Sequence, residues 1–460
     1  PLAPPSKRSG PYDKSTGNLT MLGCVLQVDF RTLVRYYLCA GRGSSNGGVM
    51  TYSTTTITQK YHDAIVDWQE RNFPELDLLT KHWADYFKGV PPFELVAKVG
   101  DLKTDVIEIG QYTGRRRFES AREMVGNAFF SARDIVRAQC STELGSIQQH
   151  RLTLDRAFND KGKFAVLRIM AEELRHAYQM LWVLDQDPTW KKPGLGDVAK
   201  QTIEELLSME LGGHVLDAFN IDFNDFLDNV TYATVIDLVG KYQLEMQQVF
   251  SYAPMARSMG PMLQEEAFHL GSGRKLLKEI GQMAARGEGD YSIEDVQRAM
   301  NLWFPRGLEM FGNEHGGETA VTFGFKDKTN GTAQSEYIEE VRGVIRNVNV
   351  AIVQERLPAI SREDAHSLID EIERSGDPKQ GLKPEDLISL PDTKFFRKRG
   401  PEEYIFKPYD VRGSLLTENG SPLSPAAYLQ YLSTTLPARF IGSREFNKYV
   451  DQMDEFYAGK

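Results

Sequence analysis

The chain has 460 residues, of which 41% are hydrophobic and 26% charged, a globular composition with enough residues for two or three domains. Its formal net charge of -10 excludes the basic face that binds nucleic acid, and its three cysteines stand in no metal-ligand spacing. No apolar run approaches the roughly 18 to 20 residues that span a bilayer. We therefore expect no nucleic-acid or membrane partner and a cytoplasmic protein without a disulfide framework.

The first 49 residues differ in composition from the rest of the chain. Residues 1–18 are rich in Pro, Ser, Gly and Lys, and a Ser- and Gly-rich run precedes Met50. The apolar patch between them lacks the basic start and the small-residue cleavage site of a signal peptide. We expect residues 1–49 to be a disordered or non-native leader, with Met50, or alternatively Met21, as the natural start.

Helical periodicity begins near residue 58 and continues through most of the chain. Two helices are expected within 58–88, separated near Pro74. A long stretch without proline, 118–158, predicts the next helix, and after the turn signal at 159–163 the helical pattern resumes over 164–184. This pair of helices forms a predicted hairpin.

A second set of helices is expected over 198–219, over 229–252 and from the region of Pro261 to residue 285. Pro254 predicts the break before the last of these, and Pro261 suits the first turn of a helix. Beyond them, Gly and Asp residues interrupt the helical pattern and predict only a short helix near 300–312, followed by a Gly-, Thr- and Asn-rich loop.

These elements predict a mainly α protein with a bundle of long helices at its centre. We expect four parts along the chain. They are a leader at 1–49, an N-terminal helical segment at 50–110, the bundle at 111–290, and a mixed C-terminal extension at 291–460 that packs on the bundle.

The pattern Glu-x-x-His occurs at 173–176, 266–269 and 363–366. In a chain with eight histidines, about half of one such pair is expected by chance. The third pair follows Ser361 and resembles an ordinary helix start, with a capping residue and acids in the first turn. The pattern by itself is weak evidence of a metal site.

An upstream acid distinguishes the first two pairs from the third. Glu143 and Asp237 each lie about 30 residues before the glutamate of a pair, with a turn signal near the middle of the interval. Because two antiparallel helices rise equally, by about 1.5 Å per residue, each acid returns to the level of its pair. At the matching positions before the third pair stand Ala333 and Gln334.

Packed as a four-helix bundle, the two hairpins bring four carboxylates and two imidazoles to one height. This is the arrangement of di-iron and di-manganese carboxylate sites, and hard oxygen donors with one imidazole per metal favour iron or manganese. The alternative is that the acids face water; Asp237, however, stands among apolar neighbours, and burying acids without a cation is costly. The candidate metal ligands are Glu143, Glu173, His176, Asp237, Glu266 and His269.

At these residues the chain resembles the ferritin-like di-iron oxygenases, and within them the group of the benzoyl-CoA and phenylacetyl-CoA epoxidases. In that group the ligands follow the order Glu, Glu-x-x-His, Asp, Glu-x-x-His. The segments GKYQLEMQ, PMLQEEAFHL, LEMFGNE and LPDTKFF are also similar. The resemblance extends over residues 55–440, is loose at 402–420 and has no counterpart at 1–49.

The resemblance implies a ferritin-like four-helix bundle that holds two iron ions, with manganese as the alternative. Its bridging ligands would be Glu173 and Glu266, and its terminal ligands Glu143, His176, Asp237 and His269. It also implies a monooxygenase that epoxidises an aromatic acyl-CoA such as benzoyl-CoA. Electrons would come from a separate reductase with NADPH, FAD and an Fe–S cluster, because this chain shows no GxGxxG or Cys-rich signature after Met50.

Several interpretations stay open at this point. The protein could be a di-metal oxygenase for a different aromatic or acyl substrate, or a ferritin-like metal protein that is no oxygenase. A radical subunit would place a tyrosine one turn after Glu143, where Ser146 and Ile147 stand. Gly145, Gly240 and Gly273 could leave room for an aromatic ring or could serve close helix packing. The outer partners of the two histidines are not identifiable from the pattern.

Overall fold

The computed structural model describes residues 52–223, 225–312, 314–391 and 416–435, with single positions at 408, 447, 450 and 451. The predicted leader, with both candidate start methionines and two of the three cysteines, lies outside the described residues. Within the described part, no helix is both long and apolar enough to cross a membrane.

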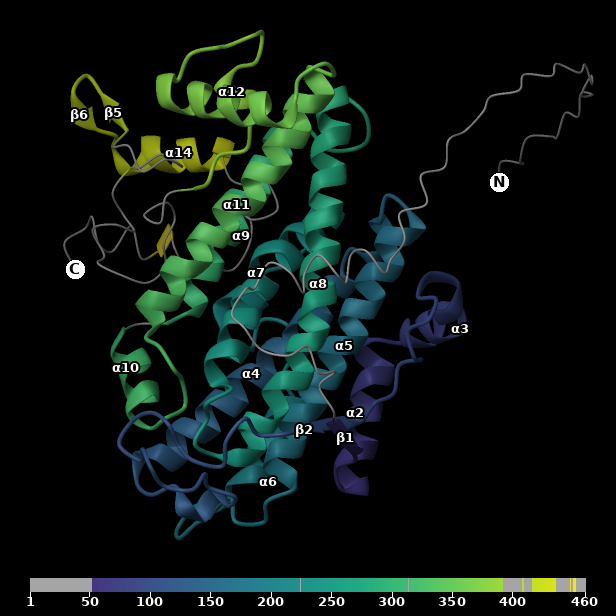
Figure 1. Cartoon of the computed structure of the whole chain (residues 1–460), viewed down its shortest axis with the longest axis vertical. Helices are drawn as coiled ribbons and strands as arrows, with labels where there is room; N and C mark the ends of the chain where they lie inside the picture. The colour runs from purple at the N-terminus through teal and green to yellow at the C-terminus, as the bar shows by residue number, and fades with distance from the viewer. Residues whose placement is uncertain are drawn as a thin grey trace, which may run out of the picture. The chain divides into compact units, whose positions relative to one another are not determined.

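Four long helices form the bundle: α4 (Asn127–Arg151), α5 (Asp160–Asp185), α7 (Phe226–Gln247) and α8 (Ala253–Arg286). They run side by side (Figure 1), with α4 against α5, α7 against α8, and α5 against α8. Many of their residues belong to one hydrophobic core. The predicted mainly α, ferritin-like bundle is confirmed.

Local sequence signals set the ends of the bundle helices. The side chain of Asn159 accepts a hydrogen bond from the Gly162 N–H at 2.8 Å and starts α5. Gly287 ends α8 with a φ of 70°, a left-handed conformation that suits glycine. The helix predicted over 118–158 is shorter, since α4 begins after Gly126, whose φ is 58°, and ends at Arg151.

The prediction that Pro261 lies in the first turn of a helix is wrong, because Pro261 lies inside α8. Pro254 takes the first-turn position instead, where its missing N–H costs nothing. A Cβ added to Gly100 would stand 3.2 Å from the Pro261 ring and 3.2 Å from the Arg257 carbonyl oxygen. Glycine at position 100 therefore lets a neighbouring strand approach the helix where proline interrupts its hydrogen bonds.

The N-terminal segment covers one side of the bundle. Strand β1 (Tyr52–Thr55) pairs antiparallel with β2 (Ala97–Gly100), so that Tyr52 is opposite Gly100. The two predicted helices are α2 (Gln59–Asn72) and α3 (Leu76–Tyr86). Strand β2 packs on α5 and α8.

Short elements join the two hairpins of the bundle. The helix predicted over 198–219 is shorter: α6 covers Val198–Leu207 and ends at Ser208, and Gly212, with a φ of 97°, lies in the turn that follows. The remaining short elements are η1 (Ala121–Glu123), η2 (Leu154–Arg156), η3 (Asp217–Asn220), β3 (Lys191–Lys192) and β4 (Gly196–Asp197).

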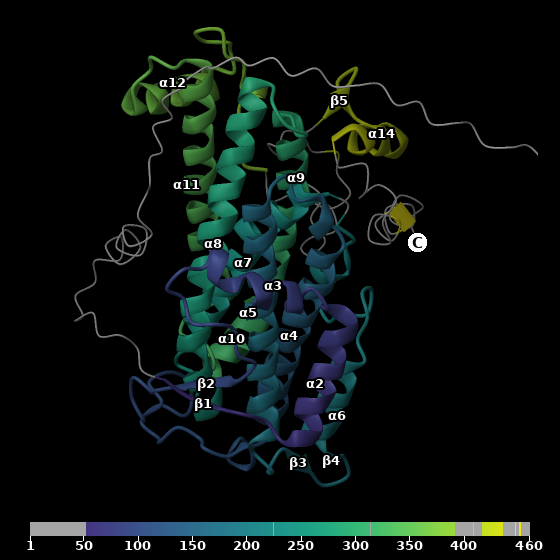
Figure 2. The same ribbon diagram turned by 90° about the vertical axis from the view of Figure 1, so that its right-hand side faces the viewer.

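The region after the bundle is more helical than predicted. It contains α9 (Ile293–Met310), α10 (Glu314–Thr322), α11 (Asn330–Arg356) and α12 (Arg362–Ser375), followed by η4 (Pro384–Asp386), β5 (Thr417–Glu418), β6 (Ser421–Pro422) and α14 (Pro425–Thr435). Helix α9 packs on α7 and α11 on α8 (Figure 2). Tertiary packing thus stabilises helices that the Gly and Asp punctuation argued against. The four domain boundaries stay a prediction.

Candidate metal centre

All six predicted ligands lie in the bundle core. Helix α4 carries Glu143, α7 carries Asp237, and α5 and α8 each carry one Glu-x-x-His pair. None of these six residues is more than 8% exposed. The structure therefore brings together from four helices the residues that the spacing singled out.

Two overlapping groups have the size of a metal site. In the first, one donor atom each from Glu143, Glu173 and His176 lie within 4.8 Å of one another. In the second, the same holds for Glu173, Asp237 and His269. Glu173 belongs to both groups, which is the position that a bridging carboxylate occupies.

Glu266 also faces both histidines. Its Oε1 lies 3.7 Å from His176 Nδ1 and its Oε2 lies 3.5 Å from His269 Nδ1. The two imidazole rings are 5.7 Å apart between centroids. Each oxygen of this carboxylate thus points to a different side of the centre.

The donor atoms of this cluster lack partners within the protein. Among the described residues, His176 Nδ1, His269 Nδ1, Asp237 Oδ2 and Glu266 Oε2 are buried without a hydrogen bond. Buried polar atoms rarely lack a hydrogen-bond partner. Imidazole nitrogens gathered with carboxylate oxygens are the donor atoms of a metal site. Four carboxylates and two imidazoles fit two hard divalent cations such as iron or manganese.

The electrostatics of the metal-free cluster lead to the same conclusion. Burial raises the pKa of Glu143 to about 8, although its hydrogen bond with Glu173 opposes the shift. Burial and then neighbouring carboxylates raise the pKa values of Glu173 and Asp237 well above their usual range. Burial alone would lower the pKa of His269, but Glu266 and other carboxylates outweigh it and raise that pKa. The metal-free cluster therefore holds protons that bound cations would replace.

Two further glutamates hold the outer nitrogens of the histidines. His176 Nε2 lies 3.1 Å from Glu265 Oε2, and His269 Nε2 lies 3.2 Å from Glu172 Oε2. Each of these glutamates directly precedes the Glu-x-x-His glutamate of the opposite helix. They orient both rings so that Nδ1 faces the centre. The sequence interpretation did not assign them, although the doubled glutamate before each pair was the available signal.

Cations balance the charge of these two outer glutamates. The Arg168 guanidinium donates to Glu172 Oε1 at 3.0 Å. Glu265 accepts hydrogen bonds from Arg175 and Lys98. Burial opposes ionisation of Glu265, but its hydrogen bond to His176 and the charge of Arg175 lower its pKa. It is therefore ionised and able to accept from the imidazole.

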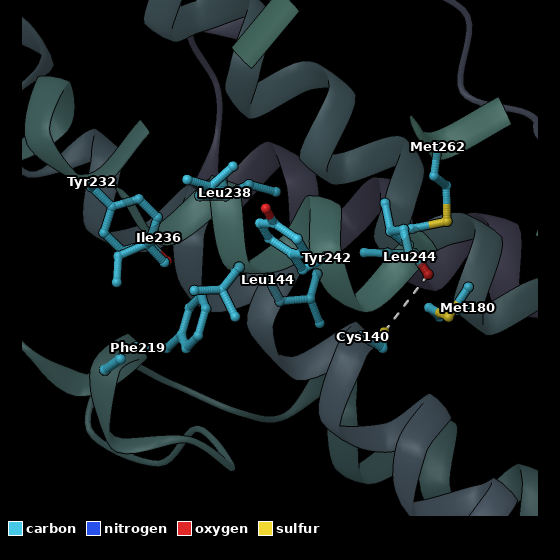
Figure 3. Packing of buried hydrophobic residues seen from close by; sticks show 14 of the residues in the cluster. Cys140, Leu144, Met180, Phe219, Tyr232, Ile236, Leu238, Tyr242, Leu244 and Met262 are labelled. Atoms are coloured by element: carbon cyan, nitrogen blue, oxygen red, sulfur yellow. Dashed lines mark hydrogen bonds between the residues drawn. The ribbon is translucent and has the colours of Figure 1, made fainter. Parts of the chain in front are cut away.

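Buried apolar side chains from all four bundle helices pack together in the hydrophobic core (Figure 3). Cys140 and Leu144 come from α4, Met180 from α5, Leu238 from α7 and Met262 from α8, and all are buried. The Cys140 thiol lies 3.6 Å from the Ala177 carbonyl oxygen. This packing keeps bulk water away from the carboxylates and strengthens their electrostatic interactions.

The three glycines near the ligands differ in their surroundings. A Cβ at Gly145 would stand 3.0 Å from the His214 ring, and one at Gly273 would stand 2.7 Å from the Ala233 backbone. These two glycines serve close packing. A Cβ at Gly240 would meet only the Glu266 carboxylate, with Oε1 at 3.7 Å. Only Gly240 leaves space beside a predicted ligand.

The third Glu-x-x-His pair lies apart from the centre, on α12. Ser361 Oγ accepts a hydrogen bond from the Asp364 N–H at 3.0 Å and caps this helix. Arg346 Nε donates to His366 Nδ1 at 3.0 Å. The interpretation of this pair as a helix start is confirmed.

Comparisons with known proteins agree with this arrangement. A family model described as phenylacetic acid catabolic protein matches residues 165–376, a range that includes α5, α7 and α8. Benzoyl-CoA oxygenase component B of Aromatoleum evansii is 25% identical over 269 residues, which cover 53% of this chain and 54% of that relative. The chain thus matches about half the length of this relative, whose name describes one component of an oxygenase.

Proposed function

We propose that this chain, which belongs to the ferritin-like di-iron oxygenase family, is the oxygenase component that inserts one oxygen atom of O2 into an aromatic acyl-CoA. The matching family and the relative support an oxidoreductase of the oxygenase type. The observation that carries the finer proposal is the convergence of two imidazole Nδ1 atoms on four buried carboxylates. Benzoyl-CoA is the substrate class that the similar protein suggests.

Six side chains would hold the two metal ions in this proposal. Glu173 and Glu266 would be the ligands shared by both ions, because Glu173 belongs to both groups of donor atoms and Glu266 faces both histidines. The terminal ligands are Glu143, His176, Asp237 and His269. Two iron ions, or manganese ions in their place, supply the redox chemistry of dioxygen when bound.

The chain's other residues orient the ligands and exclude water. Glu172 and Glu265 accept hydrogen bonds from the outer imidazole nitrogens and so keep Nδ1 turned inward. Arg168 forms an ion pair with Glu172, and Arg175 forms one with Glu265. The apolar side chains around the centre limit entry of bulk water.

In this proposal, the aromatic ring of the substrate would approach the centre from the side of Gly240. Gly240 lies on α7, one turn after Asp237, and no atom except those of the Glu266 carboxylate would contact an added Cβ within 4 Å. A ring placed there stands next to a bridging ligand. The glycines at 145 and 273 cannot serve this role, because packed neighbours already fill the space in front of them.

The electrons would come from a separate reductase that carries NADPH, FAD and an Fe–S cluster. The name of the similar protein, a component of an oxygenase, supports a multicomponent system. A pool of reduced nicotinamide cofactor is cytoplasmic, so we place the reaction in the cytoplasm.

The test combines metal analysis with turnover. We expect two iron ions per chain, together with consumption of O2, NADPH and benzoyl-CoA in equal amounts when a reductase is added. The product should be 16 mass units heavier than the substrate acyl-CoA. Glu173→Ala should abolish turnover, whereas Glu363→Ala, in the Glu-x-x-His pair outside the bundle, should retain it.

The possible failures have different meanings. Normal iron content without benzoyl-CoA binding would refute the substrate and keep the metal centre. Absence of bound iron or manganese after reconstitution would refute the centre itself. Binding of acyl-CoA without O2 consumption would refute the oxygenase activity.

A further inference from the structure

A row of polar side chains runs along one face of α4 and leads away from the metal centre. Glu143, Ser146 and His150 follow one another at spacings of three and four residues, and Thr153 continues the series just beyond the helix. Because each residue advances a helix by about 1.5 Å, this face extends about 12 Å from the predicted ligand to the end of α4 at Arg151. All four residues are buried, at 8% exposure or less.

One ring nitrogen of His150 is hydrogen-bonded, and the other has no hydrogen-bond partner among the described residues. Its Nδ1 lies 2.6 Å from Asn229 Oδ1, and the Asn229 amide donates to Thr153. The Asn229 oxygen is therefore the acceptor, and His150 Nδ1 carries the proton. His150 Nε2 is left as an acceptor, buried and without a hydrogen-bond partner. Burial lowers the pKa of this imidazole to about 4, so the ring is neutral.

Tyr232 on α7 faces the same column. Its ring packs edge-on against those of His150 and Trp303, with centroids 5.1 and 5.2 Å away. Its hydroxyl is buried and has no partner with hydrogen-bond geometry in the described residues, and the same is true of the Ser146 hydroxyl. Figure 3 shows Tyr232 beside Ile236, one turn before the predicted ligand Asp237.

The charges around Tyr232 connect it to the centre. Burial and then the Asp237 and Glu173 carboxylates raise its pKa well above the usual value, while the nearby Ser146 hydroxyl opposes this. The phenol therefore keeps its proton at neutral pH. A neutral hydroxyl can both donate and accept a hydrogen bond, which is the property that a proton carrier needs.

Packing alone does not account for this column. Phenylalanine would fill the same aromatic cage and alanine the same helix face without burying two unsatisfied hydroxyls. Three buried polar atoms, from Ser146 and His150 on α4 and from Tyr232 on α7, have no partner with full hydrogen-bond geometry among the described residues. Together they offer the two to four hydrogen bonds that a buried water molecule requires.

We propose that Ser146, Tyr232 and His150 hold a file of buried water that delivers protons to the metal centre. This inference rests on the proposed function. Conversion of O2 and a substrate into an oxygenated product and one water consumes two electrons and two protons. The electrons come from the reductase, and the protons come from solvent. The two hydroxyls pass protons by breaking one O–H bond as another forms, and His150 Nε2 fixes the water by accepting from it.

The first test uses the metal-free protein and needs no turnover. A high-resolution crystal structure should show ordered water within hydrogen-bond distance of Tyr232 Oη and of His150 Nε2. Tyr232→Phe should remove or displace that water. An anhydrous, closely packed interface between these side chains in the unaltered protein would overturn the proposal.

The second test measures how fast O2 reoxidises the chemically reduced, metal-loaded protein in H2O and in D2O. Because no acyl-CoA takes part, failure of the substrate proposal leaves this measurement intact. Tyr232→Phe and Ser146→Ala should slow the reaction about 10- to 100-fold and increase the solvent isotope effect at unchanged metal content. Unchanged rates and isotope effects in both variants would refute the relay.

Matched controls separate proton delivery from packing. Tyr242 lies on the same helix, but its hydroxyl donates to Glu340 at 2.9 Å, so Tyr242→Phe should leave the isotope effect unchanged. His214 is also buried, with Nδ1 bonded to Ser141 and Nε2 to Gln148. It is therefore the control for His150, as a buried histidine with no free nitrogen. Equal isotope effects in Tyr232→Phe and Tyr242→Phe would contradict the assignment.

Discussion

The two hairpins of the bundle contain the same ligand pattern in different surroundings. In both, an acid is followed about 30 residues later by a doubled glutamate and a histidine. The outer glutamate Glu265 contacts Arg175 and Lys98, the second of which belongs to strand β2 outside the bundle. Its counterpart Glu172 contacts Arg168 at 3.0 Å and Arg175 at 3.9 Å, both from its own helix. The repeated spacing therefore determines the ligands, and non-repeated neighbours determine how each half is held.

The hairpins also differ in their polar and apolar contacts. Helix α8 approaches α7 closely because Gly273 lies against the Ala233 backbone. Helix α4 instead carries the polar face that includes Ser146 and His150. The two metal positions would thus share a ligand type but differ in rigidity and in access to protons.

The largest effect is expected from the bridging ligands, which both halves share. Glu173→Ala and Glu266→Ala should each lose both metal ions, because one missing bridge leaves two cations in a site short of negative charge. Metal analysis of the purified variants measures this. Full occupancy in either variant would refute its bridging role.

Removing the charge of an outer glutamate should affect the two halves of the bundle differently. Glu265→Gln and Glu172→Gln are each expected to weaken metal binding by about 10- to 100-fold. Glu265→Gln should also destabilise the metal-free fold by about 3 kcal/mol, because two buried or half-buried cations lose their carboxylate. Thermal unfolding and metal titration test this, and equal stability of the two variants would contradict the difference.

Glycine substitutions compare close packing with open space. Gly273→Ala should destabilise the protein by about 1–3 kcal/mol, because its Cβ would overlap the α7 backbone. Gly240→Ala should change stability little but reduce turnover of the aromatic substrate. Denaturant unfolding and steady-state kinetics measure the two effects. Similar unfolding midpoints for the two variants would argue against the packing difference.

The last expected effect is a pH dependence of the metal-free protein. Burial raises the pKa of Glu143 from 4.5 to about 8, so the folded state binds more protons than the unfolded state between these values. The stability from this group is complete below pH 4.5 and is lost as the pH rises through about 8. Unfolding of the metal-free protein measured from pH 5 to 8 should show this decline. Added iron or manganese should oppose it, since metal binding requires the deprotonated carboxylates.

Much of the centre was predictable because helical geometry is regular. Residues three apart share a helix face, and an acid on the preceding antiparallel helix returns to the same level. The ends of helices were less predictable. Pro261 lies inside α8 and the region 293–356 is mostly helical, since packing against β2 and the bundle outweighs the local signals.

The spacing along the chain was enough to select the six side chains that could meet, because it follows from the rise and period of α-helices. The packing of the helices was needed to show which glutamate holds which histidine, since the pairs Glu172–His269 and Glu265–His176 join different helices. It was also needed to show that a Cβ at Gly240 would contact only the Glu266 carboxylate, whereas one at Gly273 would overlap the Ala233 backbone. The same is true of Tyr232, whose position beside α4 depends on how α7 lies in the bundle rather than on its place in the chain.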